Sequence, residues 1–75
     1  RYDVMIEFDD RALVFEVKSA AADEDTDALA GSALRQITEK RYGADTGKPV
    51  IAVGLAFRGK ECAAAAAVSE CGKNN

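Results

Sequence analysis

The chain has 75 residues, of which 48% are hydrophobic and 31% charged, and its formal net charge is −3 at pH 7. A chain this short forms one domain at most and buries only about 60% of the surface that its unfolded form exposes. The chain has no histidine and no CxxC spacing between Cys62 and Cys71, which argues against a zinc site. It also has no apolar run long enough for a membrane span and no leader pattern, so we expect a cytoplasmic protein with reduced thiols.

Two segments near the N-terminus, residues 2–8 and 12–18, alternate between apolar and polar side chains as strands do. The intervening Asp9-Asp10 predicts a hairpin with a two-residue turn. In that register the apolar residues match in pairs: Tyr2 with Val17, Val4 with Phe15 and Ile6 with Leu13. We expect this apolar face, which also carries Phe8, to be the core.

The opposite face of the hairpin carries the residues that bear on function. The same register places Asp3 directly opposite Glu16, with Lys18 two residues further along. Facing carboxylates repel unless a proton or a cation lies between them, and a divalent cation is the obvious candidate. A slip by two residues would instead pair Asp3 with Lys18, which is the more ordinary outcome on spacing alone.

The acidic residues 23–27 suit the first turn of a helix, where the backbone dipole favours negative charge. We expect a helix from about Glu24 to Tyr42, ended by Gly43 in the left-handed conformation. Its predicted apolar stripe contains Leu29, Ala33, Gln36, Ile37 and Lys40, with Ala30 and Leu34 beside it. The amide of Gln36 therefore lies at the edge of the buried face, where it either reaches solvent or needs a hydrogen-bonding partner.

Residues 50–57 are continuously apolar, as in a strand covered on both faces, and a right-handed crossover makes this strand parallel to residues 12–18. A turn at residues 58–60 should return residues 61–69 as an antiparallel strand, although Ala63–Ala67 favour helix by propensity. The predicted fold is α/β, with a mixed sheet in the order ββαββ. Residues 71–75 are expected to form a disordered tail.

Four segments together resemble the PD-(D/E)XK nuclease superfamily: residues 1–6, 15–18, 36–42 and 53–57. The likeness is greatest to the C-terminal nuclease-like domain of bacterial proteins whose N-terminal part is AAA-ATPase-like. The resemblance implies a partial restriction-endonuclease-like core over residues 1–70, without the usual preceding helix and strand. It also implies that the chain is a piece of a longer protein.

What the resemblance implies for chemistry is hydrolysis of phosphodiester bonds with Mg²⁺ or Mn²⁺. Asp3, Glu16 and the main-chain carbonyl of Val17 would hold the metal, Lys18 would lie near the attacking water, and Gln36 would face the active site. The alternative is a catalytically inactive module of the same fold that binds nucleic acid or protein. A third possibility is a purely structural α/β fragment.

The partners expected from this reading are nucleic acid, DNA more than RNA, and no membrane. The net charge of −3 and the absence of a basic stripe argue against strong DNA binding by the isolated chain. Because two helices normally flank the fold and one is present, we also expect a homo-oligomer, or docking to the rest of a longer parent protein.

Overall fold

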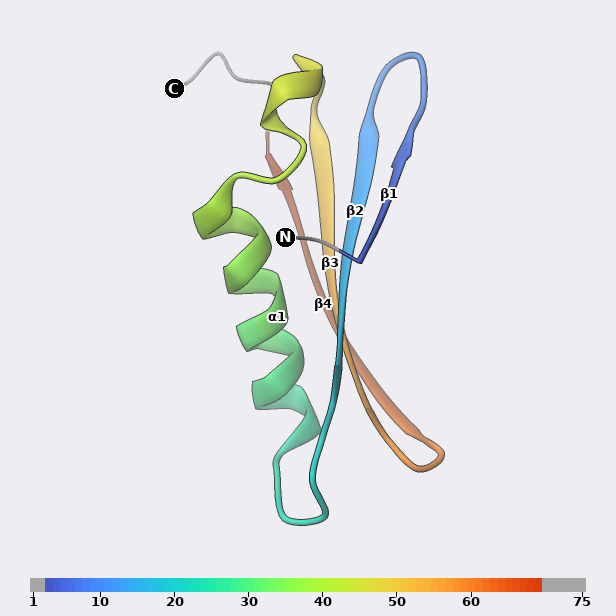
Figure 1. The fold of residues 1–75 in the computed structure, drawn as a ribbon, viewed down its shortest axis with the longest axis vertical. Coiled ribbons are helices and arrows are strands. Elements are labelled where there is room, and N and C mark those ends of the chain that lie inside the picture. Colours follow the sequence, from blue (N-terminus) through green and yellow to red (C-terminus); the bar gives the residue numbers. More distant parts are fainter. Residues whose placement is uncertain (1–2, 70–75) are drawn as a thin grey trace.

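The computed structural model describes residues 3–69, and these form a single sheet with one α-helix (Figure 1). The elements in chain order are β1 (Val4–Glu7), β2 (Ala12–Ser19), α1 (Thr26–Lys40), the short 3₁₀ helix η1 (Ala44–Thr46), β3 (Val50–Arg58) and β4 (Glu61–Ser69). The predicted α/β class with the order ββαββ is therefore confirmed. The predictions for Tyr2 and for the tail lie outside the described residues.

The four strands lie in the order β1-β2-β3-β4, and only the central pair, β2 with β3, is parallel. The hairpin register is the predicted one, with Val4 opposite Phe15 and Ile6 opposite Leu13. The Phe8 N–H donates to the Arg11 carbonyl at 2.7 Å and closes the two-residue turn. The last strand is also confirmed, because ladder hydrogen bonds to β3 override the helical propensity of its alanines.

Helix α1 begins at Thr26, two residues after the expected start, because Asp25 caps it by accepting the Asp27 N–H at 3.1 Å. The prediction that Gly43 ends the helix is wrong. Arg41 is the left-handed C-cap, with φ of 57°, and its N–H points to the Ile37 and Thr38 carbonyls. Gly43 is also in the left-handed conformation, with φ of 85°, but it is the N-cap of η1 and not the residue that ends α1.

The prediction of the core face is wrong, because α1 covers the other side of the sheet. Val4 and Ile6 are 47% and 44% exposed, whereas Val14 is fully buried. Alternation shows that a strand has two faces, but it does not show which face the helix will cover. The covered face here carries small residues on β3 and β4, and these let the helix backbone come close: Ala52, Gly54, Ala56, Ala63, Ala65 and Ala67.

Gly54 marks the closest approach of α1 to the sheet. A Cβ atom on this residue would lie 2.4 Å from the Ala30 carbonyl oxygen and 2.5 Å from the Leu34 nitrogen. Beside it, Val14, Ile37, Val50 and Ala52 form the main buried cluster. Lys40, which the sequence places on the buried stripe, is exposed, so that part of the prediction is wrong.

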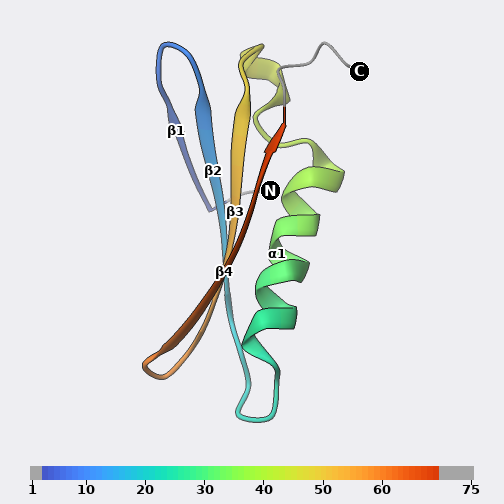
Figure 2. The ribbon, with the colours of Figure 1, turned by 180° about the vertical axis from the view of Figure 1, so that it is seen from behind.

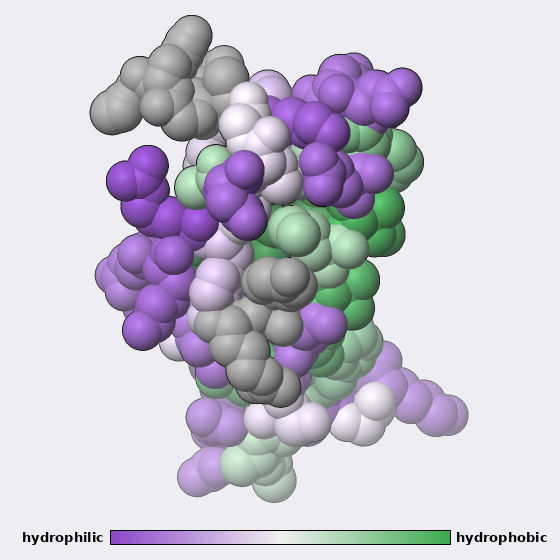
Figure 3. All heavy atoms as spheres, turned by 45° about the horizontal axis from the view of Figure 1, so that its top comes forward, coloured by the Kyte–Doolittle hydropathy of each residue, from purple (hydrophilic) through white to green (hydrophobic). Residues whose placement is uncertain are grey.

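The second face of the sheet has no described element against it, as the two opposite views show (Figures 1 and 2). The continuously apolar β3 is therefore covered on one side only within residues 3–69, not on both as expected. Hydrophobic side chains gather along the side of the sheet that faces away from α1, at the right of Figure 3. No helix within residues 3–69 is long and apolar enough to cross a membrane.

Candidate metal centre

Asp3 is held at the point where β1 stops pairing with β2. Its N–H donates to the Phe15 carbonyl at 3.0 Å, and its Oδ2 accepts the Val17 N–H at 2.6 Å. Asp3 itself lies in a bend one residue before the described pairing, so its predicted position opposite Glu16 is not part of that pairing, whereas the pairing of Val4 with Phe15 establishes the register of the hairpin. A two-residue slip that would pair Asp3 with Lys18 is therefore excluded.

Glu16 is the only charged residue buried among those described, with 5% exposure, and its Oε1 has no hydrogen-bond partner there. Its side chain lies on the face that α1 covers, which is the face opposite to the predicted core. Across the sheet it is level with Gly54 and Ala65. Because these neighbours are so small, the helix packs down beside Glu16 and excludes water from it.

The main-chain carbonyl of Val17 lies on the same edge of β2 as the Asp3 carboxylate. The N–H and C=O of one residue in a strand point to the same neighbour, and the Val17 N–H reaches Asp3. The described pairing of β1 with β2 ends at Val4 and Phe15, two residues before this carbonyl. A metal ligand from this main-chain position is compatible with the fold.

Lys18 follows Glu16 by two residues and lies on the same face of β2, level with Ala56. It is half-buried, and its ammonium group makes no hydrogen bond or ion pair within residues 3–69. Lys48, by contrast, is engaged: its Nζ lies 2.7 Å from Glu7 Oε2 and 2.7 Å from the Phe8 carbonyl oxygen. Glu7 is thus paired at the far end of β1 from Asp3.

Gln36 lies on α1, directly before the buried Ile37 and three residues after the buried Ala33, and it is half-buried. The helix thus places it at the edge of its packed face, as expected. Its side-chain amide makes no hydrogen bond within the described part of the chain. The hydrogen bond from the Val17 N–H ties Asp3 to β2, on which Glu16, Val17 and Lys18 follow one another, whereas Gln36 comes from a separate element.

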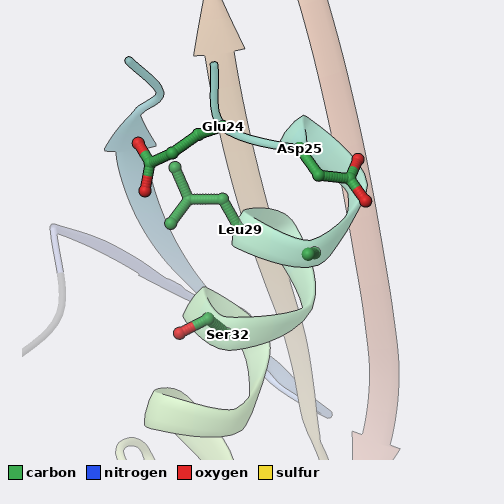
Figure 4. Close-up of a pocket in the computed structure, with 5 residues that line it drawn as sticks. Glu24, Asp25, Leu29 and Ser32 are labelled. Carbon is green, nitrogen blue, oxygen red and sulfur yellow. The ribbon is translucent and has the colours of Figure 1, made fainter. Parts of the chain in front are cut away.

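An open hollow of about 260 Å³ lies near the N-terminus of α1, lined by Glu24, Asp25, Ala28, Leu29 and Ser32 (Figure 4). Its two carboxylates are used in local structure: Glu24 Oε1 accepts the Ala21 N–H at 2.7 Å, and Asp25 caps the helix. None of the predicted site residues lines it. The hollow is therefore a capping arrangement and not the candidate centre.

The donor set at the hairpin fits a hard divalent cation. Within residues 3–69 no three His, Cys, Asp or Glu side chains come together as a metal site, so at most two carboxylates are present here. Magnesium commonly takes one or two carboxylates and completes its shell with carbonyl oxygens and water. The buried, unpartnered Oε1 of Glu16 is the observation that favours a cation, since such an oxygen is costly when left alone.

Sequence reasoning missed Gly54, although a signal was present. A glycine inside a strand often marks a place where another backbone approaches closely. In this chain it allows α1 to bury Glu16, and so determines the environment of the candidate ligand.

The fold is a mixed four-stranded sheet with one helix, in the chain order ββαββ. One strand is preceded by an acidic residue and the next carries Glu-x-Lys, and together these features define a nuclease-type fold. A scan against protein-family models matches residues 1–66 to the PD-(D/E)XK nuclease superfamily, and the chain belongs to that superfamily. Its members generally use divalent metals. No curated protein and no solved structure is significantly similar to the chain.

Proposed function

We propose that this chain is a metal-dependent nuclease domain that hydrolyses phosphodiester bonds, with DNA as the preferred substrate over RNA. The single observation that carries the proposal is the buried carboxylate of Glu16, whose Oε1 has no partner within residues 3–69. An ionised carboxylate removed from water needs a compensating positive charge.

Asp3, Glu16 and the Val17 carbonyl would hold Mg²⁺ or Mn²⁺, which would supply an acidified water and stabilise charge on the phosphoryl oxygens. The hydrogen bond from the Val17 N–H fixes the Asp3 carboxylate beside β2 before any ligand binds. Such preorganisation matters because phosphoryl transfer depends largely on positioning and electrostatics.

Lys18 would orient the attacking water and offset the negative charge that grows on the phosphoryl group in the transition state. Its ammonium group is not engaged by another side chain within the described residues, so it can contact a substrate without breaking an ion pair. Gln36, at the edge of α1, would donate an amide hydrogen bond to the water or the substrate.

Lys18→Ala should abolish Mn²⁺-dependent cleavage of plasmid DNA while the circular dichroism spectrum stays unchanged. The matched control is Lys60→Ala, because Lys60 is an exposed lysine in the turn between β3 and β4. Glu16→Gln should lose both cleavage and manganese binding by calorimetry. Cleavage that survives Lys18→Ala, or that continues in EDTA, would contradict the proposal.

The same cleavage and calorimetry measurements distinguish a nuclease from a catalytically inactive module of the same fold. Manganese binding that Glu16→Gln removes, without cleavage of DNA or RNA by the wild type, would favour a non-catalytic nuclease-fold domain. A chain that neither binds manganese nor cleaves would favour the purely structural reading.

We also propose that the domain works in the cytoplasm as part of a longer protein with an AAA-ATPase-like region. The support is the resemblance carried by residues 1–6, 15–18, 36–42 and 53–57. The sequence of the full-length parent protein tests this directly, and a parent without such a region would contradict it.

A further inference from the structure

The candidate metal centre is level with the middle of α1. Gly54 packs against the turn of the helix between Ala30 and Leu34. Glu16 is the partner of Gly54 in the pairing of β2 with β3, so it is level with the same turn. Lys18 lies two residues further along β2, nearer the start of α1, because β2 and α1 run in opposite directions (Figure 1).

One edge of α1 faces the side of the sheet where β2 lies. The Leu29 and Ser32 side chains are on this edge, on the side of the helix away from β4 (Figure 4). Side chains four residues apart are neighbours on a helix, so Gln36 and Lys40 continue the same edge toward the end of α1. At 1.5 Å per residue, Lys40 lies about 12 Å beyond the turn that is level with Glu16.

Lys40 carries a positive charge that the protein does not use. It is exposed, and its ammonium group makes no hydrogen bond or ion pair within residues 3–69. Lys48 and Arg58, in contrast, are bound to Glu7 and Glu61. The Lys40 ammonium group can therefore bind an anion without first breaking an internal contact.

The charge along α1 and its flanking loops changes sign from start to end. Residues 20–34 contain four acidic side chains and no basic one, whereas residues 35–48 contain four basic side chains and two acidic ones, Glu39 and Asp45. A polyanion that passes the candidate centre is therefore repelled at the start of α1 and attracted at its end.

We propose that Lys40 binds a backbone phosphate of the DNA strand that is cleaved at the candidate centre. In this arrangement the strand runs from Lys18 along the edge of α1, past Gln36, toward the end of the helix. The inference rests on the proposed nuclease function and adds the path of the substrate to it. Because a lysine meets a phosphate as a point charge, the contact is independent of DNA sequence.

Three substitutions in a Lys18→Ala background, which should bind DNA without cleaving it, test the contact. Lys40→Gln, Arg35→Gln and Lys60→Gln each remove one positive charge from an exposed side chain, so the net charge changes equally. Arg35 lies about 100° around the helix from Gln36, and Lys60 lies between β3 and β4. In fluorescence anisotropy with a labelled duplex and Mn²⁺, Lys40→Gln should weaken binding about threefold to tenfold, and each control less than about twofold.

The salt dependence of binding identifies the contact as one to phosphate. A lysine on a phosphate releases a counterion from the DNA, so Lys40→Gln should reduce the slope of log K against log salt by about 0.9. Lys40→Arg keeps the charge and should restore both the affinity and the slope. A weaker affinity with an unchanged slope, or no rescue by Lys40→Arg while circular dichroism shows a folded chain, would overturn the proposal.

The outcomes for Lys40 and for the nuclease function can be told apart. Equal losses of affinity in the three variants, with cleavage by the wild type, would overturn the Lys40 contact and leave the nuclease function standing. A loss specific to Lys40→Gln, without cleavage by the wild type, would support the contact in a non-catalytic module. If the Lys18→Ala chain did not bind the duplex in Mn²⁺, the contact would be overturned whether or not the wild type cleaves.

Discussion

Glu16 is the residue on which the candidate site depends. On a solvent-exposed face of a hairpin, a glutamate would need no partner. The structure instead places it under α1 with 5% exposure and with one oxygen unpartnered within residues 3–69. A buried carboxylate in this state requires a cation, a proton or a donor, and this turns a common residue into a candidate ligand.

Asp3 has a structural role beside its proposed one, and substitutions can separate the two. Asp3→Asn keeps an oxygen to accept the Val17 N–H but removes the negative charge of the side chain. We expect weaker manganese binding, with the hydrogen bond from the Val17 N–H retained. Asp3→Ala also removes the acceptor and should lower the free energy of unfolding by about 1 kcal/mol.

Urea titrations in EDTA and calorimetry with manganese measure the two effects. If Asp3→Asn destabilised the metal-free protein as much as Asp3→Ala, the carboxylate charge would be required for folding. Unchanged manganese affinity in both variants would remove Asp3 from the metal centre.

At the scale of elements, the contact between α1 and β3 depends on the absence of a side chain at Gly54. An added methyl group would overlap backbone atoms, which cannot move aside as a flexible side chain can. Gly54→Ala should therefore lower the free energy of unfolding by about 1–3 kcal/mol, or more if the helix cannot shift. Glu16 should also become more exposed, because the helix that covers it is lifted.

Gly31→Ala is the matched control, because it lies within α1 with open space around its Cβ position. It should raise stability by about 0.5–1 kcal/mol through helix propensity. Thermal and urea unfolding of the two variants measure the difference. A Gly54→Ala protein as stable as Gly31→Ala would show that the helix does not pack closely on β3.

The elements themselves were largely predictable from the sequence, since turn residues and alternation determine the hairpin register and the short turn determines β4. The side of the sheet that α1 covers was not predictable from the sequence. Val4, Ile6, Leu13 and Phe15 form the more apolar side, which ordinarily indicates a core, but the helix is Ala-rich where it touches the sheet. Packing of small residues against small residues decided the outcome, and no single-strand pattern contains that information.

The molecule as a whole has two layers with different chemistry on its two sheet faces. The α1 side carries the candidate metal centre, and the strand residues on the opposite face are apolar apart from Ser19, with Arg11 over the Phe8 ring at the hairpin turn. Acidic residues exceed basic ones by three, and one of the basic residues, Arg58, is used internally. Its guanidinium group binds Glu61 at 2.6 Å and the Glu24 carbonyl, which joins the β3–β4 hairpin to the start of α1.

Because acidic residues outnumber basic ones, a phosphate backbone gains little from the protein alone. Binding of a DNA duplex should therefore require the divalent cation, which neutralises the carboxylates at the hairpin and contacts the phosphate. We expect Lys18→Ala, which should bind without cleaving, to bind a labelled duplex in Mn²⁺ and to lose at least about tenfold in affinity in EDTA. Fluorescence anisotropy measures this, with Glu16→Gln as the control that should bind weakly in both conditions. Equal affinity of Lys18→Ala with and without manganese would mean that DNA contacts a surface other than the candidate centre.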